Sequence, residues 1–120
     1  EAARFTQIDY DREMALVLTE PGAPGTTDIF GVVRIHADPD NEQAEFAIIV
    51  GKRMTGNGYG SLLMNRIIAY ARARGTGSLF GYVLTDNRRM LDLCAGLGFE
   101  RAPMAEDASV TKGSLNLRAT

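Results

Sequence analysis

The 120 residues are enough for one domain that buries its own hydrophobic core. A hydrophobic content of 45% excludes disordered and fibrous classes, and a net charge of −2 argues against a nucleic-acid partner, because binding phosphates needs an excess of Lys and Arg. The single cysteine, Cys94, allows no internal disulfide, and no stretch has the pattern of a membrane span or signal peptide, so we expect a cytoplasmic protein without a membrane partner.

The first half of the chain is predicted to be mainly β-structure. Residues 1–13 are polar with scattered apolar side chains, which predicts a short turn or helix. Strands are predicted over 14–19 and 29–36, separated by a loop rich in Pro and Gly. A third strand is predicted over 44–50, where every residue except Glu45 is apolar, which predicts burial on both faces.

The second half alternates helices with strands. Apolar residues at helical spacing predict a helix over 61–74, and a strand follows over 79–84. A second helix is predicted to begin after Asp86 or Asn87 and to run to about residue 97. The tail predicts a strand over 115–117, with a weaker signal over 109–112. This order indicates an α/β or α+β fold with a mixed, mostly antiparallel sheet flanked by helices.

A glycine cluster joins the third strand to the first helix. Gly56, Gly58 and Gly60 alternate with other residues, so the backbone can turn tightly and direct its N–H groups at one point. The helix that begins at Ser61 adds further N–H groups and a positive dipole end. The spacing is typical of a phosphate or diphosphate site, although a plain glycine-rich turn is an equal alternative. A P-loop is disfavoured because no Lys precedes Ser61.

The pattern Arg-x-x-Gly-x-Gly over 53–58 resembles the acyl-CoA signature of the Gcn5-related N-acetyltransferase (GNAT) superfamily. The resemblance continues through the strands within 14–50, the helix at 61–74, the strand at 79–84 and the Asn…Gly-Phe segment at 87–99. It implies the GNAT acyl-CoA N-acyltransferase fold, with acetyl-CoA as co-substrate. No His, Cys or Asp cluster has metal-ligand spacing, so no metal is expected.

The resemblance also implies which residues bind acetyl-CoA. Backbone N–H groups near Ile48 and Val50 would hold the thioester carbonyl and the pantetheine arm. Asn87 would hydrogen-bond the same arm, with a helix N-cap as the equal alternative. The diphosphate would lie on the segment Arg53, Met54, Thr55, Gly56, Asn57, Gly58, Tyr59, Gly60 and Ser61.

A closer resemblance points to the acceptor. Segments 5–15, 38–41 and 44–50 are similar to the C-terminal acetyltransferase domain of the bacterial protein lysine acetyltransferases called Pat. This implies a lysine of a protein, such as an acyl-CoA synthetase, as acceptor, and residues 1–120 as a single domain of a larger multidomain chain. Two alternatives stay open: an acetyltransferase of a small-molecule amine, and a non-catalytic acyl-CoA sensor.

Glu45 is the candidate general base. An amine must lose a proton before it attacks a thioester, and a free lysine has a pKa of about 10.4. From its residue type alone, Glu45 fits a structural ion pair and a base equally well; the resemblance favours the base, with Glu42 next in line. We expect burial among Phe46 and Ile48 to raise the pKa of Glu45.

Three further side chains near the second helix have open roles. GNAT enzymes often carry a tyrosine as general acid four residues before the Gly-Phe pair, and Cys94 occupies that position here. We expect Cys94 to be a small buried residue, and no general acid is assigned. Arg88 and Arg89 are expected to form a solvated helix face, with assistance to a CoA phosphate as the alternative.

Overall fold

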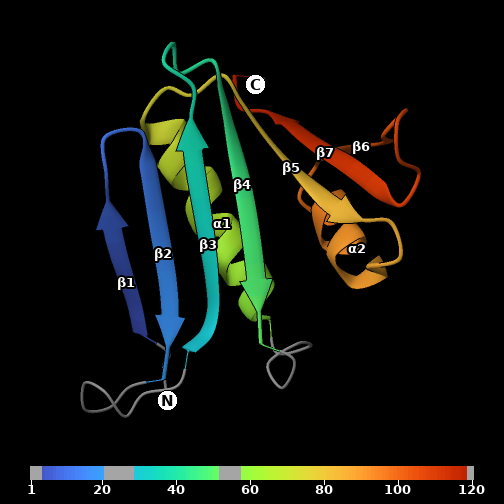
Figure 1. Cartoon of the computed structure of the whole chain (residues 1–120). Coiled ribbons are helices and arrows are strands. Elements are labelled where there is room, and N and C mark those ends of the chain that lie inside the picture. Colours follow the sequence, from blue (N-terminus) through green and yellow to red (C-terminus); the bar gives the residue numbers. More distant parts are fainter. Residues whose placement is uncertain (1–3, 21–28, 52–57, 119–120) are drawn as a thin grey trace.

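The computed structural model describes residues 4–20, 29–51 and 58–118, and these ranges form a seven-stranded sheet with two helices (Figure 1). The elements in chain order are β1 (Arg4–Asp9), β2 (Glu13–Thr19), β3 (Ile29–Ala37), β4 (Gln43–Val50), α1 (Tyr59–Ala73), β5 (Ser78–Leu84), α2 (Arg88–Gly96), β6 (Glu100–Pro103) and β7 (Val110–Asn116). No helix within these ranges is long and apolar enough to cross a membrane.

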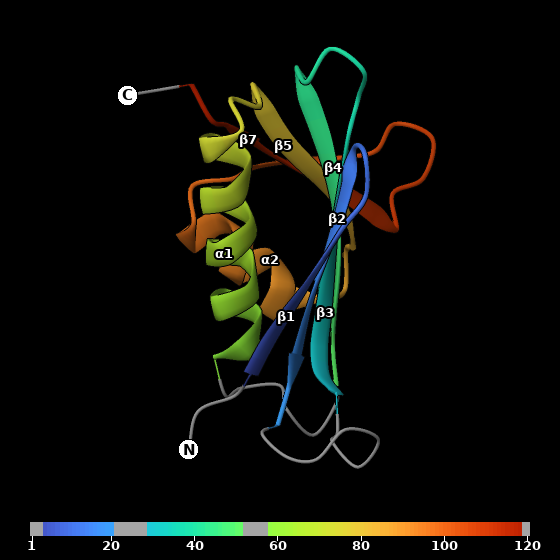
Figure 2. The same cartoon turned by 90° about the vertical axis from the view of Figure 1, so that its left-hand side faces the viewer.

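The sheet is mixed and mostly antiparallel, as predicted. Its strand order is β1-β2-β3-β4-β5-β7-β6, and only the central pair, β4 and β5, is parallel. Parallel neighbours need a crossover connection, and α1 provides it between β4 and β5. Both helices lie on the same face of the sheet (Figure 2).

The core lies between this face and the helices. Every second residue of β2 is buried, namely Met14, Leu16 and Leu18, as expected for a strand with one covered face. The helix α1 contributes one stripe at helical spacing: Leu63, Met64, Ile67, Ile68 and Ala71. Burying such side chains contributes roughly 1.5–3 kcal/mol each. One cluster therefore joins the strands to α1.

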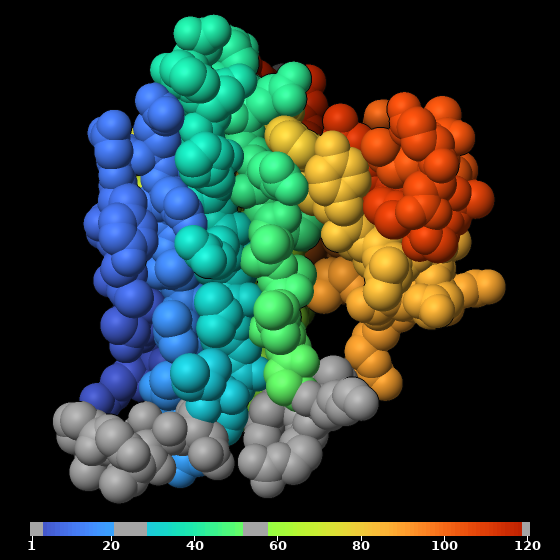
Figure 3. Space-filling view, viewed as in Figure 1, coloured from blue at the N-terminus to red at the C-terminus, as the bar shows by residue number. Residues whose placement is uncertain are grey.

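The opposite face of the sheet corrects one expectation. Glu45, Ala47 and Ile49 are exposed, so β4 is buried on one face and not on both. Figure 3 shows this open face directly, with neither helix lying over β1 to β4. The apolar run in β4 predicted burial on both faces. It fits a strand at the centre of the sheet, but it does not show whether one face or both faces of the sheet are covered.

Two strands were not predicted. Residues 4–9 form the edge strand β1 instead of a turn or helix, and all six pair in register with β2. The strand β6 pairs with β7, which is one continuous strand where the sequence indicates two separated signals. Five of the six residues of β1 and all four of β6 are exposed, so neither carries the apolar alternation that reveals a strand.

Candidate functional site

The two parallel strands at the centre of the sheet pair over only part of their length. Their register runs from Gln43↔Ser78 to Phe46↔Gly81, although β4 continues to Val50 and β5 to Leu84. The strands therefore part after Phe46. The ring of Phe46 packs against Gly81 at this junction. A side chain at position 81 would collide with it, because a Cβ there would lie 2.5 Å from the ring.

The parting leaves backbone amides of β4 directed at β5 without a partner in register. The N–H of Gly51 donates to the carbonyl of Phe30 on β3, at 2.9 Å. Backbone polar groups alternate along a strand, so the N–H groups of Ile48 and Val50 point the other way, toward β5. They lie beyond the last β4–β5 pair, where an extended ligand could continue the ladder. These are the two residues whose N–H groups the sequence predicts to hold the thioester carbonyl and the pantetheine arm.

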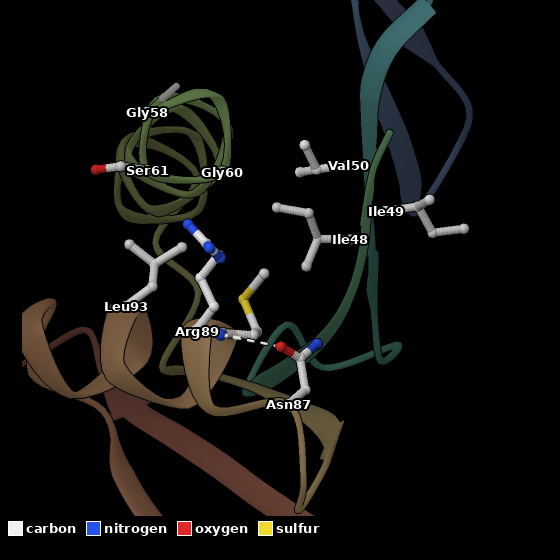
Figure 4. A pocket seen from close by; sticks show the side chains of 10 residues that line it. Ile48, Ile49, Val50, Gly58, Gly60, Ser61, Asn87, Arg89 and Leu93 are labelled. Carbon is white, nitrogen blue, oxygen red and sulfur yellow. Dashed lines mark hydrogen bonds between the residues drawn. The ribbon is translucent and has the colours of Figure 1, made fainter. Parts of the chain in front are cut away.

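A cavity of about 440 Å³ occupies the space beside these amides (Figure 4). Three elements line it: the end of β4, the start of α1 and the start of α2. Its lining residues are Ile48, Ile49, Val50, Gly58, Gly60, Ser61, Asn87, Arg89, Met90 and Leu93. The volume lies within the range of small-molecule sites, and the apolar walls suit the uncharged arm of a cofactor.

The start of α1 can accept an anion. Gly58 is the N-cap with φ 82°, a left-handed conformation that favours glycine, and its carbonyl accepts the N–H of Leu62 at 3.0 Å. Gly58 has no side chain with which to cap the helix, and the described first turn of α1 contains no acidic residue. The first turn of α1, with its N–H groups and the positive end of the helix dipole, therefore lies at the end of the cavity that Gly58, Gly60 and Ser61 line.

The start of α2 forms the facing wall. Asn87 is the N-cap, since its side-chain oxygen accepts the N–H of Met90 at 3.2 Å, and Asn87 also lines the cavity. The capping role foreseen from the sequence is thus present, and it leaves the amide nitrogen of the side chain available to a ligand. Met90, Leu93 and Arg89 line the cavity as well, although the sequence did not single out the first two.

Several predicted binding residues are not located here. Arg53, Met54, Thr55, Gly56 and Asn57 lie outside the described residues. Tyr59 is described; its ring stacks on Phe30 with centroids 4.9 Å apart, and Tyr59 does not line the cavity. Gly58, Gly60 and Ser61, by contrast, come together with Ile48, Val50 and Asn87, which lie far from them in the sequence.

Glu45 lies on the open face of the sheet. It pairs in register with His36 on β3 and with Phe80 on β5. It is exposed, which overturns the expectation that Glu45 is buried among Phe46 and Ile48. Among the described residues no ion pair includes Glu45, so the ion-pair interpretation has no support there. Ile49 lies on this same open face and also lines the cavity, so the cavity reaches the side of the sheet that carries Glu45.

Two other ionisable candidates are separated from the cavity. Glu42 binds Arg118, with 2.8 Å between Oε1 and Nη1. Cys94 is fully buried in the core, and burial raises the pKa of its thiol, so it stays protonated at neutral pH. These positions fit the prediction that Cys94 is a packing residue.

Comparison with known proteins identifies the family. The model of the acetyltransferase (GNAT) family matches residues 1–99. The chain belongs to the GNAT acetyltransferase family. This confirms the superfamily resemblance inferred from the glycine loop, while no comparison shows the closer resemblance to Pat-type domains.

Individual relatives agree with the GNAT assignment. The chain is 33% identical over 96 residues to acetyltransferase PA5475 of Pseudomonas aeruginosa, covering 80% of this chain and about half, 51%, of that protein. A GNAT-family acetyltransferase from Streptococcus pneumoniae is 27% identical with a TM-score of 0.71, over 89% of this chain and 68% of that one. A spermidine N-acetyltransferase from Vibrio cholerae, in complex with CoA and spermine, is 19% identical with a TM-score of 0.75, over 89% and 67%. The predicted GNAT fold is confirmed.

Proposed function

We propose that this GNAT domain transfers the acetyl group of acetyl-CoA to a primary amine. The observation that carries the proposal is the cavity where β4 and β5 part, because it combines the amides of Ile48 and Val50 with the start of α1. The amides suit a pantetheine arm laid along β4. The start of α1, together with the segment 53–57, suits the diphosphate.

Each group would contribute to one direct transfer. The amine nitrogen attacks the thioester carbonyl carbon, a C–N bond forms, the C–S bond breaks, and the thiolate of CoA leaves. Glu45 takes the proton of the attacking amine, directly or through a water. The amide of Ile48 or Val50 stabilises the negative charge that develops on the carbonyl oxygen. No residue is assigned to protonate the thiolate.

A small-molecule amine is the acceptor that we propose first. Support comes from structural neighbours that are spermidine N-acetyltransferases of Vibrio cholerae, although an identity of 19% to this chain shows only a shared fold. A protein lysine is the second candidate. Two observations favour a protein acceptor: the resemblance to Pat-type domains, and the exposure of Glu45, which a large acceptor could reach.

One assay separates these functions. Release of free CoA from acetyl-CoA is followed with a panel of acceptors: polyamines, aminoglycosides, a lysine peptide and an acyl-CoA synthetase. Turnover with a polyamine or another small amine supports the first candidate, and turnover restricted to the peptide or the synthetase supports the second. Binding of acetyl-CoA without turnover on any acceptor would identify a sensor instead of an enzyme.

A further inference from the structure

We propose that Arg89 binds the diphosphate of acetyl-CoA from the α2 side of the cavity, opposite the start of α1. This inference rests on the proposed function, since it assigns a contact for the same co-substrate. Arg89 is the second residue of α2 and lies within the first turn, which Asn87 caps. Figure 4 shows its side chain reaching from α2 toward the first turn of α1, near Gly60.

The charge balance of the cavity favours this role. Among the lining residues that the structure describes, Arg89 is the single charged one, and most of the others are apolar or glycine. Within the described part of the chain, no ion pair engages its guanidinium. The start of α1 offers only partial positive charge, about half of one unit, whereas a diphosphate carries roughly two negative charges. The full positive charge of Arg89 on the facing wall would balance more of the diphosphate charge than the helix end does alone.

The side chain also has suitable geometry. A guanidinium presents its N–H donors as a planar fork that can engage two phosphate oxygens at once. The two helices approach closely here, since a Cβ placed on Gly60 would lie 3.3 Å from Leu93. A diphosphate lying on the first turn of α1 would therefore be within reach of a long side chain from α2.

The neighbouring Arg88 provides a matched control. It has the same charge and length but lines a different cavity, with Leu84, Thr85, Asp86, Ala108 and Ser109. Successive residues of a helix point about a quarter of a turn or more apart, and Arg88 does not line the cavity at the start of α1. The sequence gives no reason to assign the two arginines different roles, whereas in the structure they line different cavities.

Titrations of three ligands test the assignment. Calorimetry measures acetyl-CoA and its 3′-dephospho form, and NMR titration measures S-acetylpantetheine, which carries no phosphate. For Arg89→Gln we expect about tenfold weaker binding of both phosphate-bearing ligands, the loss of one charge-assisted contact, and unchanged binding of S-acetylpantetheine. Arg88→Gln should match the unsubstituted chain for all three, and circular dichroism checks that both variants fold.

Each other result overturns the inference in a recognisable way. Equal affinity of Arg89→Gln and the unsubstituted chain for acetyl-CoA would remove Arg89 from the site and leave the proposed function intact. A loss that disappears with the 3′-dephospho form would assign Arg89 to the 3′-phosphate. A loss that extends to S-acetylpantetheine would indicate a packing role. Absence of acetyl-CoA binding by the unsubstituted chain would overturn the proposed function together with this inference.

Discussion

Replacing Glu45 separates chemistry from binding at the scale of single residues. Glu45→Gln keeps the shape of the side chain and removes the proton acceptor, so we expect kcat to fall by about a hundredfold or more. Because the side chain is exposed on the face opposite the helices, the affinity for acetyl-CoA should not change. The loss should shrink at high pH, where more of the amine is already neutral.

Glu42→Gln is the control for this change. The Glu42 carboxylate binds Arg118, so we expect near-normal kcat from this variant. A large loss in Glu42→Gln beside normal turnover in Glu45→Gln, measured as initial rates at saturating acetyl-CoA, would move the general base to Glu42.

Cys94 should affect stability more than catalysis. The residue is fully buried, so Cys94→Ala leaves a small cavity and should lower the free energy of unfolding by about 1 kcal/mol, with kcat within about threefold. Burial raises the pKa of the thiol. The stability that this shift contributes is present below the ordinary thiol pKa of about 8.5 and is lost as the pH rises through the raised value.

Urea unfolding between pH 7 and pH 10 measures this effect. The unsubstituted chain should lose more stability over this interval than Cys94→Ala, which has no thiol to ionise. A drop in kcat of a hundredfold or more in the variant would instead make Cys94 the missing general acid.

At the scale of elements, the start of α1 can be tested with two similar glycines. Gly58 and Gly75 have φ of 82° and 78°, and a Cβ at either would meet no atom within 4 Å. Alanine at each should therefore cost about 1 kcal/mol of stability through backbone conformation alone. Only Gly58 lines the cavity, so Gly58→Ala should also weaken acetyl-CoA binding, by about tenfold, and Gly75→Ala should not. Calorimetry showing equal affinities would exclude the start of α1 from the site.

The elements also show where sequence prediction succeeds. The strands β2 to β5 and both helices were predicted because their apolar periodicity and their capping residues are local signals. The edge strands β1 and β6 were missed because they form by pairing with β2 and β7, and their own sequences carry no local strand signal. In the site, Gly58 and Asn87 were found from local patterns. The roles of Met90 and Leu93 depend on how α2 docks, which no local pattern records.

At the scale of the whole molecule, acid should weaken the fold through its surface carboxylates. A hydrogen bond from Arg34 lowers the pKa of Glu13, and hydrogen bonds from Ser109 lower the pKa of Asp107. A depressed pKa contributes stability above the unfolded value and loses it as the pH falls through the folded value. The free energy of unfolding should therefore be steady above pH about 4.5 and fall below it.

Glu13→Gln isolates one part of this acid dependence. The variant lacks the carboxylate that pairs with Arg34, so it should be less stable than the unsubstituted chain at pH 7 and should lose less on acidification. The two stability curves, from urea unfolding, should converge as the pH falls through the lowered pKa of Glu13. Parallel curves would show that the pair does not stabilise the fold.

The parting of β4 and β5 has a consequence for the order of events in turnover. The cavity is lined by Ile48 and Val50 on the helix side of β4 and by Ile49 on the open side, and a hollow beside β4 is visible in Figure 3. A donor held on the helix side would leave the Glu45 side free, so neither reactant would need to depart before the other arrives. Initial-rate plots at several fixed amine concentrations should then intersect, as in a sequential mechanism. Parallel lines would instead reveal an acetylated enzyme, for which the described part of this cavity offers no nucleophilic cysteine.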